Sequence, residues 1–231
     1  MEIVIYGCFS LFIIMIHEII KYTKKITANM YIIGVILFFT IIGLIPLFGY
    51  AISTSQERIK NGVNADPPNI QSIFSLTYKG IVGIGIIILM LLPSGLIYLS
   101  MPILIDLVDI GESTLLTGLM GLIAILGLLF ALSGLYLFSA MIFAYSRYSV
   151  DDRLSLTNSI VSTIINVSLS KKYFTVFMYV MALSVLYGIF TQILFFTIIF
   201  APFVGILALI YFSALGYVIG SLTTEFGPVL D

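Results

Sequence analysis

The sequence predicts an all-α fold, a polytopic transmembrane helix bundle. Of its 231 residues, 61% are hydrophobic and only 9% are charged, whereas a soluble domain carries roughly 25% charged residues. Several apolar runs also exceed the roughly 18 residues that mark a membrane-spanning helix. A surface of this composition is stable in a bilayer rather than in water, so we expect a multi-pass protein of the cell membrane.

The apolar runs indicate about six spans. The first, residues 3–20, is just long enough to cross the bilayer. The others are expected near residues 30–53, 80–105, 115–145, 173–200 and 203–222. The last boundary is placed at Ala201-Pro202, because a residue before proline avoids helical geometry; Gly188 and Gln192 are alternatives. We therefore divide the chain into an N-terminal helix with a basic loop (1–29), a membrane domain (30–222) and a short acidic tail (223–231).

Two polar segments, 54–79 and 147–172, lie between spans 2/3 and spans 4/5. Each contains a stretch with the 3.6-residue period of an amphipathic helix, at 69–79 and at 154–170. We expect both helices to pack on the bundle and to form its main interaction surface. The candidate residues are Phe74, Lys79, Ile164, Ile165 and Lys171, with Phe74 and Ile164 buried. The alternative is that both segments are mobile connectors whose basic residues only set the topology.

The distribution of basic residues predicts the orientation. If the spans alternate, both polar segments and both termini share one side of the membrane. That side holds Arg58, Lys60, Lys79, Arg147, Arg153, Lys171 and Lys172, and the other side holds Lys21, Lys24 and Lys25. The positive-inside rule then places both termini in the cytoplasm.

Small and polar residues inside the spans predict helix packing. Gly216 and Gly220 form a GxxxG pattern, and Ala140 and Ala144 share its spacing. Such pairs let two helix backbones approach closely, and we favour packing within the chain over a dimer contact. Gln192 is the most polar side chain at depth, and we expect it to form an interhelical hydrogen bond.

Catalytic, metal and cofactor sites are not expected. His17-Glu18-Ile-Ile-Lys21 lacks the second histidine of the zinc-protease pattern. Asp106, Asp109 and Glu112 lie three residues apart, and we interpret them as a solvated turn rather than a cation site. The single cysteine, Cys8, is expected to be a small packing residue.

The middle of every expected span lacks ionisable side chains, which coupled transporters and proton relays require. We therefore expect a non-catalytic structural or permease-like subunit, not an enzyme. The alternative is a transporter or channel for an uncharged or lipid-like substrate. The expected partners are the lipid bilayer and a membrane-protein subunit or a second copy of the chain, but not nucleic acid, because the chain has no basic block.

Several short motifs follow one another between the second and third expected spans. They are Gly49-Tyr50, Arg58, Lys60-Asn-Gly62, Asp66-Pro67-Pro68, an amphipathic stretch 70–74, and Lys79-Gly80. In this order the chain resembles an uncharacterised membrane family of archaea and bacteria, the domain of unknown function number four thousand and thirteen. The resemblance covers roughly residues 30 to 222. It departs from the family in its apolar first helix and in lacking an aromatic-rich acidic motif after Pro68. It implies a multi-pass membrane protein and assigns no functional residues.

Overall fold

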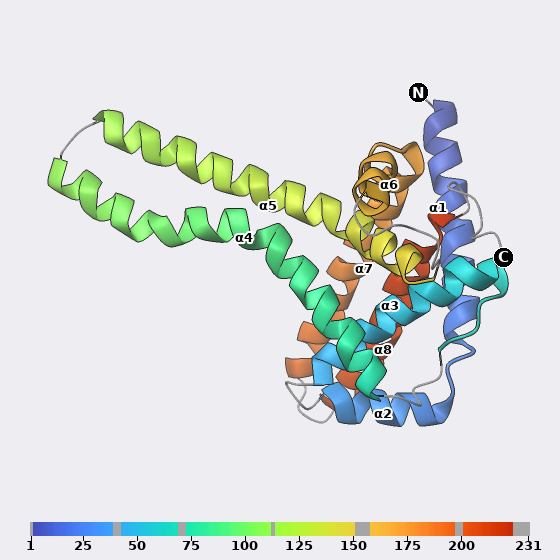
Figure 1. Cartoon of the computed structure of the whole chain (residues 1–231). Coiled ribbons are helices and arrows are strands. Elements are labelled where there is room, and N and C mark those ends of the chain that lie inside the picture. Colours follow the sequence, from blue (N-terminus) through green and yellow to red (C-terminus); the bar gives the residue numbers. More distant parts are fainter. Residues whose placement is uncertain are drawn as a thin grey trace. The chain divides into compact units, whose positions relative to one another are not determined.

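The computed structural model describes residues 2–38, 43–68, 73–111, 114–150, 158–196 and 201–223. These residues form helices and connecting turns, with no strand among them, so the all-α prediction is confirmed (Figure 1). In chain order the elements are α1 (Glu2–Thr23), α2 (Ala28–Phe38), α3 (Leu44–Asn61), the short 3-10 helix η2 (Gly62–Asn64), α4 (Ile73–Gly111), α5 (Thr114–Tyr148), α6 (Asn158–Ser168), α7 (Lys171–Phe196) and α8 (Ala201–Gly220).

Four of the described helices are long and apolar enough to cross a membrane. These candidate spans are Ile73–Ile103 in α4, Thr117–Tyr148 in α5, Lys171–Leu194 in α7 and Phe203–Gly220 in α8. They fall on the four expected spans of the C-terminal two thirds of the chain. The expected spans at 3–20 and 30–53 are not among them, so the structure supports four crossings and does not establish six.

The expected span near 30–53 is divided between two helices, α2 and α3. Helix α3 begins at Leu44 and carries Pro46 in its first turn, where the missing N–H of proline removes no helical hydrogen bond. The helix then continues to Asn61, eight residues beyond the expected end, and stops at Gly62. The φ of Gly62 is +57°, a conformation that costs glycine little. The first part of the polar segment that we expected between two spans is therefore the second half of a helix.

The two expected amphipathic helices have different outcomes. Residues 73–79 are the first turns of α4, which continues to Gly111 with Pro93 and Pro102 inside it. The prediction of a separate helix at 69–79 is therefore wrong, and residues 69–72 lie outside the described part. Helix α6 is separate from α7, as expected, and residues 154–157 of its predicted range lie outside the described part.

The chain divides into two compact units, Gly85–Ser139 and the remainder, Met1–Ile84 with Ala140–Asp231. The smaller unit consists of the C-terminal part of α4 and the N-terminal part of α5. Two glycines of α5 allow close packing there: an added Cβ at Gly134 would lie 2.7 Å from the Met90 carbonyl oxygen, and one at Gly127 would lie 2.9 Å from Ile97. The parts of α4 and α5 in the smaller unit therefore pack closely against each other at these two glycines.

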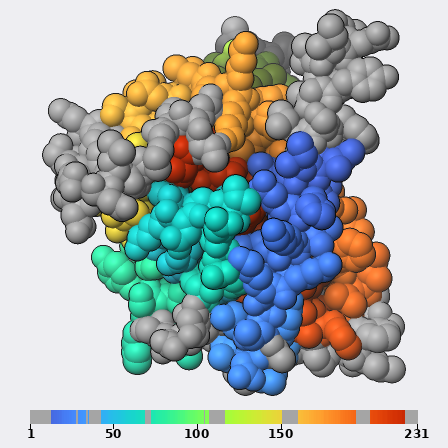
Figure 2. Space-filling view, turned by 90° about the vertical axis from the view of Figure 1, so that its right-hand side faces the viewer, coloured from blue at the N-terminus to red at the C-terminus, as the bar shows by residue number. Residues whose placement is uncertain are grey.

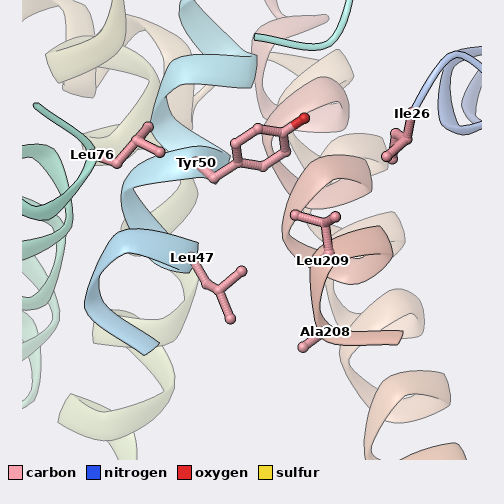
Figure 3. Packing of buried hydrophobic residues seen from close by; sticks show 6 residues of the cluster. All are labelled: Ile26, Leu47, Tyr50, Leu76, Ala208 and Leu209. Atoms are coloured by element: carbon pink, nitrogen blue, oxygen red, sulfur yellow. The ribbon is translucent and has the colours of Figure 1, made fainter. Parts of the chain in front are cut away.

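The core of the larger unit lies between α3 and α8. One cluster of buried side chains there joins Ile26, Leu47, Tyr50, Leu76, Ala208 and Leu209 (Figure 3). Leu47 and Tyr50 of α3 lie beside Ala208 and Leu209 of α8, and Arg58 lies beside Gly220. Residue numbers therefore rise together along the contact, which means that the two helices run parallel.

The C-terminal end of α1 lies beside the chain that follows α3 (Figure 2). Lys25 Nζ is 2.6 Å from Asp66 Oδ1 and also donates a hydrogen bond to the Ala65 carbonyl oxygen. The alternating six-span layout places Lys25 and Asp66 on opposite sides of the membrane. That part of the layout is wrong, because residues in contact cannot be separated by a bilayer.

We predict that Gly216→Ala destabilises the larger unit. An added Cβ at Gly216 would lie 2.0 Å from the Ala51 carbonyl oxygen, so α8 would have to move away from α3, at a cost of roughly 1–3 kcal/mol. Gly188→Ala in α7 is the matched control, since nothing lies within 4 Å of the added Cβ. Thermal unfolding in detergent should show a lower Tm for Gly216→Ala only. Equal Tm values for the two variants would contradict this packing.

Candidate functional site

The second half of α3 carries a set of polar side chains that are buried, which we call its buried polar surface. Its buried side chains are Ser53, Thr54, Ser55, Gln56 and Arg58. It can be buried because the facing residues of α8 are small: an added Cβ at Gly220 would lie 2.8 Å from the Ser55 carbonyl oxygen and 2.7 Å from Arg58 Cβ. The GxxxG pattern thus brings α8 against the polar part of its own chain.

Arg58 is the most deeply buried charge of this surface, with 3% of its side chain exposed. Its Nη2 donates a hydrogen bond of 2.9 Å to Oε2 of Glu18, on α1. The guanidinium carbon lies 4.3 Å from the ring centroid of Tyr217, within the range of a cation–π contact. The Tyr217 hydroxyl also donates to Glu18 Oε2, at 3.4 Å. Arg58 therefore joins α1, α3 and α8.

One nitrogen of this guanidinium remains available for a further bond. Arg58 Nη1 is buried and has no hydrogen-bond partner within the described residues. A buried donor without a partner loses the free energy of its hydration. The site thus has donor capacity that Glu18 does not use.

Tyr22 extends the contact between α1 and the polar half of α3. Its ring centroid lies 4.6 Å from that of Tyr217, and its hydroxyl donates to Thr54 Oγ1 at 3.5 Å. Burial raises the pKa of Tyr22 to about 12, against a smaller opposite effect of the Thr54 hydrogen bond. Tyr22 is therefore a neutral hydrogen-bond donor at any physiological pH.

A second polar network connects α3 with α4 and α5. Lys79 Nζ donates to Gln56 Oε1 at 2.6 Å and to Ser53 Oγ at 3.0 Å. Gln56 Nε2 in turn donates to Ser149 Oγ, just after α5. Lys79, which we expected on an interaction surface, is instead half-buried and bonded within the protein.

An open pocket of about 610 Å³ lies beside the Arg58–Glu18 pair. Both members of the pair line it, together with Lys171 and Lys172 at the start of α7. Apolar side chains of α1 and α7 form much of the remaining wall. Lys171, a predicted surface residue, is exposed here, and Lys172 Nζ donates to the Ser221 carbonyl oxygen at 2.8 Å.

The other residues of the expected interaction surface do not share one buried face. Phe74 is 91% exposed, so its expected burial is wrong. On α6, Val167 is fully buried and Ile164 is partly buried, whereas Ile165 is 51% exposed. The buried stripe of α6 therefore passes through Ile164 and Val167, and Ile165 lies outside it.

The predicted packing residues have mixed placements. Ala140 and Ala144 are buried, and the Ala140 N–H lies 3.2 Å from the hydroxyl oxygen of Tyr173, on α7. Gln192 is exposed on α7, so it does not lie in the helix interface where we expected it. Gly216 and Gly220 both lie against α3.

In the part of the chain that the structure describes, the acidic residues and His17 do not gather around a common point. Within the described residues there is no group of three His, Cys, Asp or Glu side chains placed to hold a metal ion. His17 is exposed on α1. Of the acidic turn, Asp106 is exposed, and Glu112 lies outside the described residues.

The sequence reasoning missed the Arg58–Glu18 pair. From the sequence, Glu18 was considered only within an incomplete zinc-protease pattern and Arg58 only as a basic residue of a polar segment, and 40 residues separate them. The available signal was the position of Glu18 at the end of an apolar run. It did not identify a partner.

Comparison with known proteins gives a family and no relative of known activity. Residues 32–196 match the family described as protein of unknown function (DUF4013). No curated protein and no solved structure matches the chain. Because the match covers well over half of the 231 residues, the chain belongs to the DUF4013 family.

Proposed function

We propose that this protein is an integral membrane subunit that works without catalysing a reaction, as a structural or permease-like component of a larger assembly. The observation that carries this proposal is the surface of the smaller unit. Along α4 and α5 it exposes large apolar side chains, among them Leu92, Leu96, Leu99, Ile103 and Leu122. In the most apolar 18-residue stretch of each helix, only 17% of the residues of α4 and 11% of those of α5 are buried within the chain.

The candidate spans of these helices are longer than a bilayer is thick. The candidate span in α4 has 31 residues and that in α5 has 32, which at 1.5 Å per residue is roughly 46–48 Å. A hydrocarbon core is about 30 Å thick, so lipid alone does not cover an upright helix of this length. Part of the excess is packed within the larger unit, where Leu76 of α4 and Ala144 of α5 are buried. A neighbouring membrane subunit, or a second copy, would cover the apolar surface that remains exposed.

The charged side chains inside the larger unit support a static role. Arg58 pairs with Glu18, Lys79 bonds to Gln56, and Lys172 bonds to the Ser221 carbonyl oxygen. Each of these contacts joins two helices. Charges used in this way stabilise a scaffold.

A second candidate is transport of an uncharged or lipid-like substrate. The pocket of about 610 Å³ favours it, because ligand sites are commonly 300–1,000 Å³ and largely apolar. The two proposals differ in what the purified protein does. A subunit needs its partner, whereas a transporter moves solute alone.

We expect the protein, solubilised in a mild detergent, to purify with a second membrane protein or as a homo-oligomer, and to move no solute in liposomes. Leu99→Ala with Ile103→Ala should weaken the assembly, because both side chains are exposed on α4. Val185→Ala with Ile189→Ala, exposed on α7, is the matched control and should leave it intact. Size-exclusion chromatography with light scattering measures the result. A monomer that transports solute into liposomes would contradict the proposal.

We further propose that both termini and both polar segments lie in the cytoplasm. With α4, α5, α7 and α8 as crossings, the number of spans is even and the termini share a side. Because Lys25 contacts Asp66, we place Lys21, Lys24 and Lys25 on the same side as the polar segments. This increases the excess of basic residues on that side, which the positive-inside rule assigns to the cytoplasm.

Labelling with a membrane-impermeant maleimide in a Cys8→Ser background tests this orientation. Asn64→Cys, at an exposed position, should react in inverted vesicles and not in intact cells. Asp106→Cys, exposed near the end of α4, should show the reverse pattern. Reaction of Asn64→Cys in intact cells would place the polar segments outside.

A further inference from the structure

We propose that the pocket beside Arg58 binds the phosphate headgroup of an anionic bilayer lipid, with the upper part of an acyl chain along its apolar wall. This goes beyond the proposed role as a subunit, since a lipid site is compatible with either a scaffold or a transporter. Three features carry the proposal: the level of the pocket in the membrane, its charge and its apolar lining.

The level of the pocket follows from two candidate spans. The span in α7 begins at Lys171, and the span in α8 ends at Gly220. Lys172 Nζ bonds to the Ser221 carbonyl oxygen at 2.8 Å, so the two helix ends lie side by side. Arg58 lies at the same level, because its Cβ is next to Gly220. The charged end of the pocket is therefore at a membrane–water boundary, where lipid phosphates lie.

The charge of the pocket favours an anion. Arg58, Lys171 and Lys172 line it, and Glu18 is the one carboxylate among the lining residues that the structure describes. Glu18 is already paired with Arg58 Nη2 at 2.9 Å, so its charge is offset. Arg58 Nη1 has no partner among the described residues. A guanidinium can bond two phosphate oxygens at once, and Nη1 is the donor that Glu18 leaves unused.

The lining explains why the anion would be a lipid rather than a free ion. Val176 and Tyr179 follow Lys172 by one and two turns along α7, toward the bilayer interior. A free phosphate would gain nothing from these side chains. An acyl chain would bury apolar surface against them, at roughly 25 cal/mol per Å².

Native mass spectrometry of the intact chain in detergent tests the proposal, with three probes: dioleoyl phosphatidylglycerol, dioleoyl phosphatidylcholine and inorganic phosphate. We expect phosphatidylglycerol to bind at least about fivefold more tightly than phosphatidylcholine. Lys171→Gln should weaken phosphatidylglycerol binding about fivefold, because one basic residue near a membrane contributes on this scale. Lys171 is exposed, so the variant should fold normally, which its Tm checks.

Two further variants distinguish binding in this pocket from nonspecific electrostatic attraction between the lipid headgroup and the protein. Lys60→Gln removes the same charge from an exposed position of α3 outside the pocket lining and should leave binding unchanged. Val176→Thr, whose folding its Tm checks, should weaken phosphatidylglycerol binding and leave phosphate binding unaffected. Equal effects of Lys60→Gln and Lys171→Gln, or equal affinity for the two lipids, would overturn the proposal. Tight phosphate binding with no effect of Val176→Thr would instead identify a site for a free anion and would also overturn it.

Discussion

The burial of the Arg58 guanidinium between α1, α3 and α8 is the constraint on which the larger unit depends. Removing an ion from water costs several kcal/mol unless it is paired and hydrogen-bonded. Here Glu18 supplies the counter-charge, and the Tyr217 ring covers the guanidinium. This pairing requires α1 to run beside α3 and α8. It also requires glycine at positions 216 and 220, because larger side chains would separate α8 from α3.

The same arrangement explains why the polar residues of this chain lie where they do. The interior cannot offer water to polar side chains. Four of those on α3 therefore bond to other helices: Ser53, Thr54, Gln56 and Arg58. Lys79 and Gln56 connect α4 to α3, and Lys172 connects α7 to the end of α8. These bonds define a polar layer at one end of the larger unit. The layer gives the protein both a rigid scaffold and a basic pocket beside apolar helix surfaces.

The sequence predicted the helical class, the four long apolar helices of the C-terminal two thirds and the family. These follow from signals within one segment: the length of an apolar run, and the proline at 202 that separates α7 from α8. The GxxxG pair at 216 and 220 indicated a close helix contact but not its partner. The separate helix α6 was also predictable, since its period of 3.6 lies within 11 residues.

The buried polar half of α3 could not be predicted in this way. Ser53 to Arg58 has the composition of an exposed loop, and only contacts with distant segments make its burial favourable. Glu18 is 40 residues from Arg58 in sequence, and Gly220 is about four times as far. Phe74 was misplaced for a related reason. Its period fitted a short amphipathic helix, whereas the chain continues directly into α4, where this side chain is exposed.

The coupling free energy between Arg58 and Glu18 tests this account most directly. It is obtained from a double-mutant cycle of Arg58→Met and Glu18→Gln, measured by unfolding in mixed detergent micelles. We expect each single variant to be destabilised by about 3 kcal/mol and the coupling to be at least about 1.5 kcal/mol. The exposed pair of Lys25 and Asp66 is the internal reference, with an expected coupling of about 0.5 kcal/mol. Additive effects of Arg58→Met and Glu18→Gln would contradict the central role of this ion pair.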